Sequence, residues 1–301
     1  MEIKEFARKV CNAISRELGE AYRVELKEVR KNNGVILHGM MILSQPQNVA
    51  PTIYLDSFWE DYEQGTTLAE TIRRLLAVYR RDVPAGRIDM DFFHSFEKVK
   101  DRICYRLIGR ERNEELLEDV PYLEFLDLAL CFYYAYQGES LGEGTILIHN
   151  SHVKMWNIGT AELLRLARVN TPRLFPSVCS SMEEVFHEIM GDREEDCGEL
   201  RADSLPEMPM RVLSNVKRMH GAVCMLYPEV LEKLAEEEQQ GFYILPSSIH
   251  EVILLKDTGL GTPEDLKRMI AEVNNTQVAP EEVLSDSLYY YDLAEKKVRI
   301  V

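Results

Sequence analysis

Residues 149–156, with the sequence His-Asn-Ser-His-Val-Lys-Met-Trp, combine two imidazoles with an aromatic anchor after an apolar run. Imidazoles near neutral pH are ligands for zinc, nickel or iron. We expect a polar strand end here, on which His149 and His152 would point to opposite faces. A turn at Asn150 would bring the rings together. The alternatives are a site for a polar ligand, or a strand end that Trp156 anchors in the core.

A second segment, residues 246–251, has the sequence Pro-Ser-Ser-Ile-His-Glu. Ser248, His250 and Glu251 are nominally a nucleophile, a base and an orienting acid, the set used in acyl transfer. The segment lacks the G-x-S-x-G elbow of serine hydrolases. A turn between two buried strands explains the same residues, because short polar side chains cap free backbone groups.

Arg173 is a third candidate, because a fixed guanidinium fork suits carboxylate or phosphate. We expect Asn170 to cap the preceding helix and Pro172 to end it. The glycine string at 259–261 is too short for a nucleotide site, and no phosphate loop occurs, so we predict neither cofactor nor metal. The candidate ligand or partner site then comprises His149, Asn150, His152, Arg173, Ser247, Ser248, His250 and Glu251.

These candidates depend on the elements that position them. Helical spacing over 3–18, strand patterns over 22–29 and 35–43 around Asn-Asn-Gly, and a Thr67-x-x-Glu70 capping box predict an αββα-like N-terminal module over residues 1–84. A central α+β module follows over 85–181.

The central module should hold strands at 103–108, 126–136 and 145–149 and helices at 111–117 and from Thr160. Residues 182–207 carry ten acidic and two basic residues and are predicted to be an acidic linker or loop. The C-terminal α+β module over 208–301 should hold strands at 210–213, 222–226, 242–245 and 251–255, helices at 228–238 and from Thr262, and a hairpin of 289–291 with 298–301. The fold class is thus α+β, with two or three small modules whose mixed or antiparallel sheets are flanked by helices.

Charge and cysteine usage narrow the function classes. The chain has 51 acidic and 35 basic residues and a net charge of −16, which disfavours bulk-charge binding to nucleic acids or anionic membranes. Residues 1–81 hold 12 bases and 11 acids, so contact with a nucleic acid through the N-terminal module stays open. The six cysteines show no C-x-x-C spacing, and neither a secretory signal nor a membrane span is recognisable. We therefore expect a cytoplasmic protein.

Six segments carry a resemblance that extends over essentially the whole chain. They are residues 48–56, 96–102, 145–152, 170–173, 244–251 and 274–285. In these segments the chain resembles an uncharacterised domain-of-unknown-function family of anaerobic Firmicutes, often encoded on mobile elements. The resemblance implies a bacterial setting and brings no known activity and no catalytic residue.

The absence of a strong catalytic motif, together with the charge, predicts a non-catalytic macromolecule-binding or regulatory protein. Its acidic surface would suit a basic protein partner, and we expect no membrane partner. The alternative is an enzyme acting on a small polar or phosphorylated ligand at a cleft between the central and C-terminal modules, lined by the candidate residues. Whether the protein is an enzyme stays open at this stage.

Overall fold

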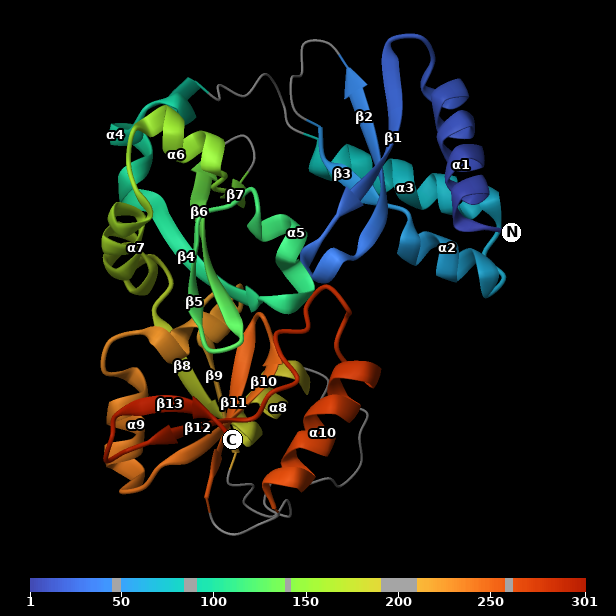
Figure 1. The fold of residues 1–301 in the computed structure, drawn as a ribbon. Coiled ribbons are helices and arrows are strands. Elements are labelled where there is room, and N and C mark those ends of the chain that lie inside the picture. The colour runs from blue at the N-terminus through green and yellow to red at the C-terminus, as the bar shows by residue number, and fades with distance from the viewer. Residues whose placement is uncertain (45–49, 84–90, 139–141, 191–209, 258–261) are drawn as a thin grey trace. The chain divides into compact units, whose positions relative to one another are not determined.

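The chain folds into two compact units. The computed structural model describes residues 1–44, 50–83, 91–138, 142–190, 210–257 and 262–301 (Figure 1). The first unit, here called the N-terminal unit, contains residues 1–93 and 136–144, and the C-terminal unit contains 94–135 and 145–301. Antiparallel sheets flanked by helices confirm the predicted α+β class. No helix in the described ranges is long and apolar enough to cross a membrane.

The predicted module boundaries at 84, 181 and 208 divide the chain more finely than these two units, and they stay predictions. The glycine string at 259–261 lies outside the described residues, and so does most of the predicted acidic linker, from residue 191 to 207. Only the first part of this linker is described, where helix α8 covers Met182–Met190.

The N-terminal unit is a three-stranded antiparallel sheet with helices packed on one face. Strand alternation turns Val24 and Leu26 toward this face, and they pair with Ile42 and Met40 of the next strand. Gly19 ends the first helix with a φ of 78°, a conformation that glycine adopts without strain. The elements are α1 (Ile3–Leu18), β1 (Tyr22–Arg30), η1 (Asn32–Gly34), β2 (Ile36–Ser44), β3 (Thr52–Tyr54), α2 (Asp56–Glu63), α3 (Leu68–Asp82) and η2 (Asp91–His94).

The first sheet of the C-terminal unit has the order β4-β6-β5, and β7 also pairs with β6. Leu126 adopts a φ of 55° in the turn between β5 and β6, so the run predicted as one strand from 126 is a hairpin that begins earlier. The elements of this part are α4 (Phe96–Val99), η3 (Lys100–Arg102), β4 (Ile103–Gly109), η4 (Glu111–Asn113), α5 (Glu114–Leu117), β5 (Tyr122–Phe125), β6 (Leu128–Gly138), β7 (Gly142–Leu147), α6 (Asn150–Trp156) and α7 (Thr160–Leu174).

The second sheet of the C-terminal unit has six antiparallel strands in the order β13-β12-β10-β11-β9-β8. Leu245 and Leu255 pack against α10 on one face, whereas Phe242 and Leu254 on the other face border Leu234 of α9. The elements are β8 (Ser177–Ser181), β9 (Met210–Asn215), η6 (Gly221–Leu226), α9 (Val230–Glu238), β10 (Phe242–Ser248), β11 (Glu251–Lys256), α10 (Pro263–Thr276), β12 (Tyr289–Asp292) and β13 (Lys297–Ile300).

Three predicted elements are wrong. The polar strand end expected at residues 149–156 is instead a helix over Asn150–Trp156, and its first backbone N–H, that of Asn150, donates to the Asp119 carbonyl at 2.8 Å. Residues 221–226 form a 3₁₀ helix instead of a strand. Five of its six residues are buried, and a run that is apolar on every side has no periodicity that could separate the two forms.

The third error concerns the end of α7, which continues through Pro172 to Leu174. Pro172 lies in the last turn, where its missing N–H removes a single helix hydrogen bond. Asn170 is therefore not a cap. Its buried amide donates to the carbonyls of Lys100 and Ile103, at 2.8 and 3.0 Å, and so ties α7 to the start of β4.

Substituting Asn170→Ala should destabilise the C-terminal unit by about 1–3 kcal/mol, because two carbonyls would lose their buried donor. Urea unfolding followed by tryptophan fluorescence would measure the change. Asn275→Ala, at an exposed position of α10, is the matched control and should change stability by less than about 0.5 kcal/mol. Equal effects of the two substitutions would contradict the role assigned to Asn170.

Candidate functional site

The predicted residues at the start of α6 form a local network of their own. The Nδ1 of His149 lies 2.8 Å from the Asp119 carboxylate, and Asn150 donates to the Glu118 carbonyl. The Nδ1 of His152 accepts the His149 backbone N–H at 3.0 Å. The helix thus places the centroids of the two rings 5.4 Å apart, and both rings use Nδ1 in contacts that stabilise the start of the helix.

Arg173 and the 247–251 turn are placed differently. Arg173 donates to the Asp101 carbonyl at 2.6 Å and to the Asn170 side chain, so it supports the end of α7. Ser247 is partly exposed, and Glu251 begins β11 opposite Ser248. The Ser248 hydroxyl accepts the His250 backbone N–H at 3.0 Å, as expected of a turn residue.

His250, in the turn between β10 and β11, contacts a second histidine, His220, which lies in the loop before η6. The Ser214 hydroxyl donates to the His250 carbonyl at 2.7 Å. Asn215 closes the loop, because its amide donates to the Met219 carbonyl at 2.8 Å. Gly221 permits this approach: a Cβ there would lie 2.2 Å from the Ser214 Oγ and 2.4 Å from the His250 carbonyl oxygen.

The backbone of this loop is strained. Arg218 and His220 adopt φ values of 51° and 53°, in the left-handed region that residues other than glycine rarely occupy. Such conformations cost about 1–3 kcal/mol each and persist where surrounding contacts enforce them. The Asn215 side chain supplies those contacts, since its Oδ1 also accepts the Lys217 backbone N–H at 3.0 Å. The loop therefore fixes the position of the His220 ring.

The two imidazoles have different hydrogen-bonding states. The Nδ1 of His250 accepts the His220 backbone N–H at 3.2 Å, so neutral His250 carries its proton on Nε2, which lies 3.5 Å from the Glu282 carboxylate. The His220 ring stacks on that of His250, with centroids 5.8 Å apart and planes at 11°. The Nδ1 of His220 is shielded from solvent and has no hydrogen-bond partner among the described residues.

Arg106 of β4 faces the same place. Its Nε is shielded from solvent, and no described residue accepts a hydrogen bond from its guanidinium or forms an ion pair with it. Burial lowers the pKa of Arg106 below its ordinary value. Its neighbour across the sheet is Cys131 of β6, and the positive charge of Arg106 is close enough to His220 to disfavour protonation of that ring.

The other groups around Arg106 are held neutral. Burial lowers the pKa of His220 to about 3, with smaller contributions from Arg106 and His250. Burial also raises the pKa of the Cys131 and Cys104 thiols to about 12, and it raises the pKa of the Tyr133 hydroxyl. Tyr133 contacts His220 with ring centroids 5.5 Å apart. We call Arg106, Cys131, Tyr133, His220 and His250 the Arg106 cluster.

The Arg106 cluster places one cation, the Arg106 guanidinium, beside the neutral side chains of Cys131, Tyr133 and His220. Guanidinium groups bind carboxylate and phosphate through parallel N–H donors, which suits an oxyanion. Acid–base chemistry is poorly supported, because a base with a pKa about 3 accepts few protons near neutrality. Within the ranges that the structure covers, no three His, Cys, Asp or Glu side chains are grouped so that they could hold a metal ion.

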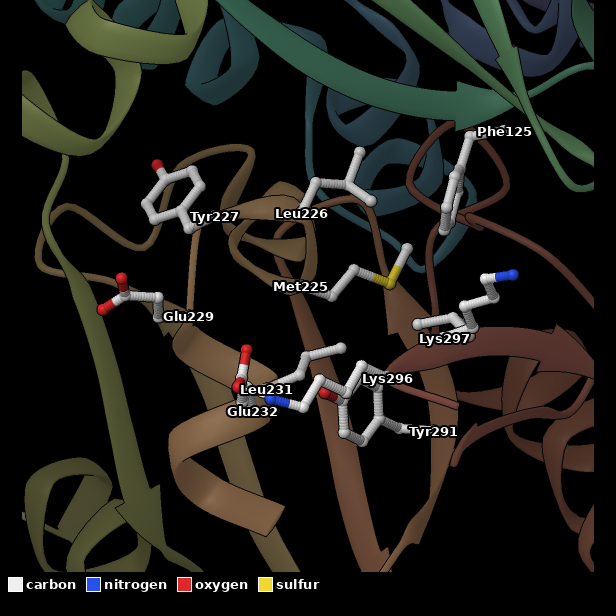
Figure 2. A pocket seen from close by; sticks show the side chains of 11 residues that line it. Phe125, Met225, Leu226, Tyr227, Glu229, Leu231, Glu232, Tyr291, Lys296 and Lys297 are labelled. Atoms are coloured by element: carbon white, nitrogen blue, oxygen red, sulfur yellow. Dashed lines mark hydrogen bonds and ion pairs between the residues drawn. The ribbon is translucent and has the colours of Figure 1, made fainter. Parts of the chain in front are cut away.

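A separate cavity of about 360 Å³ opens where the end of η6 meets α9 and the β12–β13 hairpin. Figure 2 shows its apolar residues, among them Met225, Leu226 and Leu231, between charged side chains. Lys296 extends toward Glu232, with which it forms an ion pair (Figure 2). The cavity volume is within the range of small-ligand sites.

Comparison with known proteins identifies the family. The model of a family of unknown function (DUF5688) matches residues 3–293. The chain belongs to this family. The match covers both units and confirms the resemblance to an uncharacterised family. No curated protein and no solved structure matches the chain.

The sequence led to one member of the Arg106 cluster, His250, and missed the others. The signal for Arg106 is a single arginine inside the strand Ile-Cys-Tyr-Arg-Leu-Ile at 103–108, where every other side chain is apolar or aromatic. A cation at such a position is rarely buried without a partner. His220 and Cys131 come from distant parts of the chain, so spacing alone could not group them with Arg106.

Gly221→Ala should destabilise the C-terminal unit by about 1–3 kcal/mol, because the added Cβ overlaps the Ser214 hydroxyl and the His250 carbonyl. Urea unfolding would measure the loss, and the imidazole NMR signals of His220 and His250 should shift. Gly144→Ala is the control, since a Cβ there meets no atom within 4 Å. The close approach would be refuted if both variants kept wild-type stability and spectra.

The His220 ring should stay neutral down to about pH 4, whereas an ordinary histidine protonates near 6.5. Its folded pKa is depressed, so the unfolded chain binds the proton first and stability falls as pH drops from about 6.5 toward 3. The slope from this group is about 1.4 kcal/mol per pH unit. Nitrogen-15 NMR of the imidazoles would measure the pKa.

His220→Asn is the matched variant, because asparagine tolerates a positive φ. Between about pH 6.5 and 5 its unfolding free energy should depend less on pH than that of the native protein, by the slope given above. A His220 signal that titrates above about pH 5 is incompatible with the assigned burial.

Proposed function

We propose that the protein is a non-catalytic binding protein whose C-terminal unit holds a small oxyanion, a carboxylate or phosphate group, on the Arg106 guanidinium. The observation that carries this proposal is the Arg106 guanidinium, which has no acceptor and no ion-pair partner among the described residues. Its Nε is shielded from solvent, while the residue as a whole is half-buried. The ligand would reach Arg106 from the side of His220 and His250.

Arg106 carries the energetic cost of an unpaired, half-buried charge. Removing an ion from water costs several kcal/mol unless a counter-charge and hydrogen bonds replace the lost hydration. Proteins normally supply a carboxylate, and none pairs with Arg106 within the described ranges. An oxyanion that accepts two guanidinium N–H bonds would supply both the charge and the acceptors. The site is thus better suited to the occupied state.

The character of the surrounding groups favours binding over catalysis. The lone pair of His250 at Nδ1 is already engaged by the His220 backbone N–H. His220 is a weak base because of its low pKa, and the raised pKa of Cys131 keeps its thiol protonated and unreactive. No activated nucleophile or general base therefore faces the proposed anion.

This proposal combines parts of both functions predicted from the sequence. It keeps the non-catalytic class of the leading prediction. From the alternative prediction it keeps a small ligand near His250, one of the residues that were predicted to line a cleft. In this arrangement His250 is a positioning residue for His220. A basic protein partner stays a prediction, and so does the mobile-element setting. A bacterial cytoplasm is likewise proposed, supported by the five described cysteines, which are all free.

Arg106→Met should change the stability of the protein differently in the absence and in the presence of an added anion. Without added anion the variant should be at least as stable as the native protein, because a half-buried unpaired charge is replaced by an apolar chain of similar length. With sodium phosphate or sodium acetate, the native protein should gain stability and the variant should not. An anion at ten times its dissociation constant adds about 1.4 kcal/mol. Thermal unfolding at constant ionic strength, set with sodium chloride, measures both effects.

Arg110→Met is the matched control, because Arg110 is exposed on the same chain segment and pairs with Glu124. It should retain the anion-dependent stabilisation. The proposal fails if phosphate and acetate stabilise the native protein and Arg106→Met equally, or if a wider panel of carboxylates and phosphates stabilises neither.

A further inference from the structure

Strand β13 forms one edge of the six-stranded sheet and pairs only with β12 among the described strands. The Val301 backbone N–H donates to the Leu288 carbonyl at 3.0 Å, which identifies the hydrogen-bonded pairs of this antiparallel ladder. Hydrogen-bonded and non-bonded pairs alternate, so Val298 and Ile300 belong to the non-bonded pairs. Their N–H and C=O groups point away from β12, toward the open edge.

The side chains of the same two residues leave apolar surface at this edge. Val298 and Ile300 pair with Tyr291 and Tyr289, whose rings are buried, so both lie on the face covered by η6 and α9. Ile300 nevertheless remains 45% exposed, and Val298 lines the cavity of about 360 Å³. An edge strand that presents free backbone groups beside a cavity is the arrangement used for strand addition.

The charges along the edge are positive. Lys297 and Arg299 are exposed, and neither forms an ion pair with an acidic residue in the described part of the chain. Arg299 lies over the Tyr290 ring, 5.2 Å from its centroid, on the face opposite to Val298. In Figure 2, Lys297 extends away from the ion pair of Lys296 with Glu232. A protein with a net charge of −16 thus has a basic edge strand, although Asp292 of β12 lies directly across from Lys297.

We propose that β13 binds an extended segment of a partner protein as an added strand, and that this segment alternates apolar and acidic residues. Its backbone would pair with Val298 and Ile300. Its apolar side chains would cover Ile300 and enter the cavity beside Val298, while its acidic side chains would face Lys297 and Arg299. Opposite charges on neighbouring strands stabilise pairing.

A second copy of the same chain fits this edge poorly. Antiparallel pairing of two β13 strands would place Lys297 and Arg299 of one copy near those of the other, and like charges across a ladder are destabilising. Lysine at an edge also protects sheets from self-association. The basic edge therefore selects against the protein itself and for an acidic segment.

The decisive variant is Ile300→Pro. Proline removes the N–H that points to the open edge, and it leaves the ladder with β12 intact because residue 300 donates nothing to that ladder. Ile300→Val keeps the N–H and the branched side chain, and it is the matched control. The probe is the capped peptide acetyl-Glu-Val-Glu-Val-Glu-Val-amide, titrated into the full chain and followed by the backbone amide NMR signals of residues 297–300.

The peptide should shift the amide signals of residues 298 and 300 in the native protein and in Ile300→Val. Ile300→Pro should weaken its binding by about tenfold or more, which corresponds to the loss of one hydrogen bond. A peptide with Lys in place of each Glu should bind at least about tenfold more weakly. Double substitution of Lys297 and Arg299 by Glu should reverse the preference between the two peptides.

The proposal is overturned if the acidic peptide shifts no signal of β13, or if it binds Ile300→Pro as tightly as the native protein. Dimerisation of the native protein that Ile300→Pro abolishes would assign the edge to a second copy and would also overturn it. The tyrosine signals of β12 verify that each variant keeps the hairpin. None of these readouts depends on Arg106, so this inference and the anion site are tested independently.

Discussion

The guanidinium of Arg106 sets the main constraint on the C-terminal unit. A half-buried cation requires either a counter-charge or surroundings that add no further positive charge, because each additional like charge would raise the cost of burial. The fold supplies the second condition. His220, Cys131 and Tyr133 surround Arg106, and burial keeps each of them in its neutral form.

The neutral surroundings of Arg106 depend on the loop that carries His220. Two residues of that loop, Arg218 and His220, take a backbone conformation that is unfavourable for them, and hydrogen bonds from the Asn215 side chain offset this cost. Gly221 then allows the loop to touch the turn at His250. The strained backbone therefore fixes the position of the His220 ring, as is expected where a site needs a fixed geometry.

Sequence reasoning succeeded where the signal is local. The helix start at Thr262 was predictable because its hydroxyl and the Asp265 carboxylate satisfy each other's backbone N–H groups, and the structure contains both bonds. It failed where the partner is distant. Asn170 looked like a cap because the carbonyls that it binds lie 67 and 70 residues away in the sequence. The Arg106 cluster was missed for the same reason, since its residues come from four separate segments.

The short helix η6 begins beside His220 and ends in the wall of the cavity next to β13. Its residues Gly221 and Met225 are buried, and the segment is only six residues long, so it has little freedom to absorb a displacement at one end. Were both proposed ligands to bind, any effect of the first on the affinity for the second through this segment would be returned equally by the second to the first. A small anion at Arg106 would then change the affinity of β13 for its polypeptide, although the two ligands share no contact.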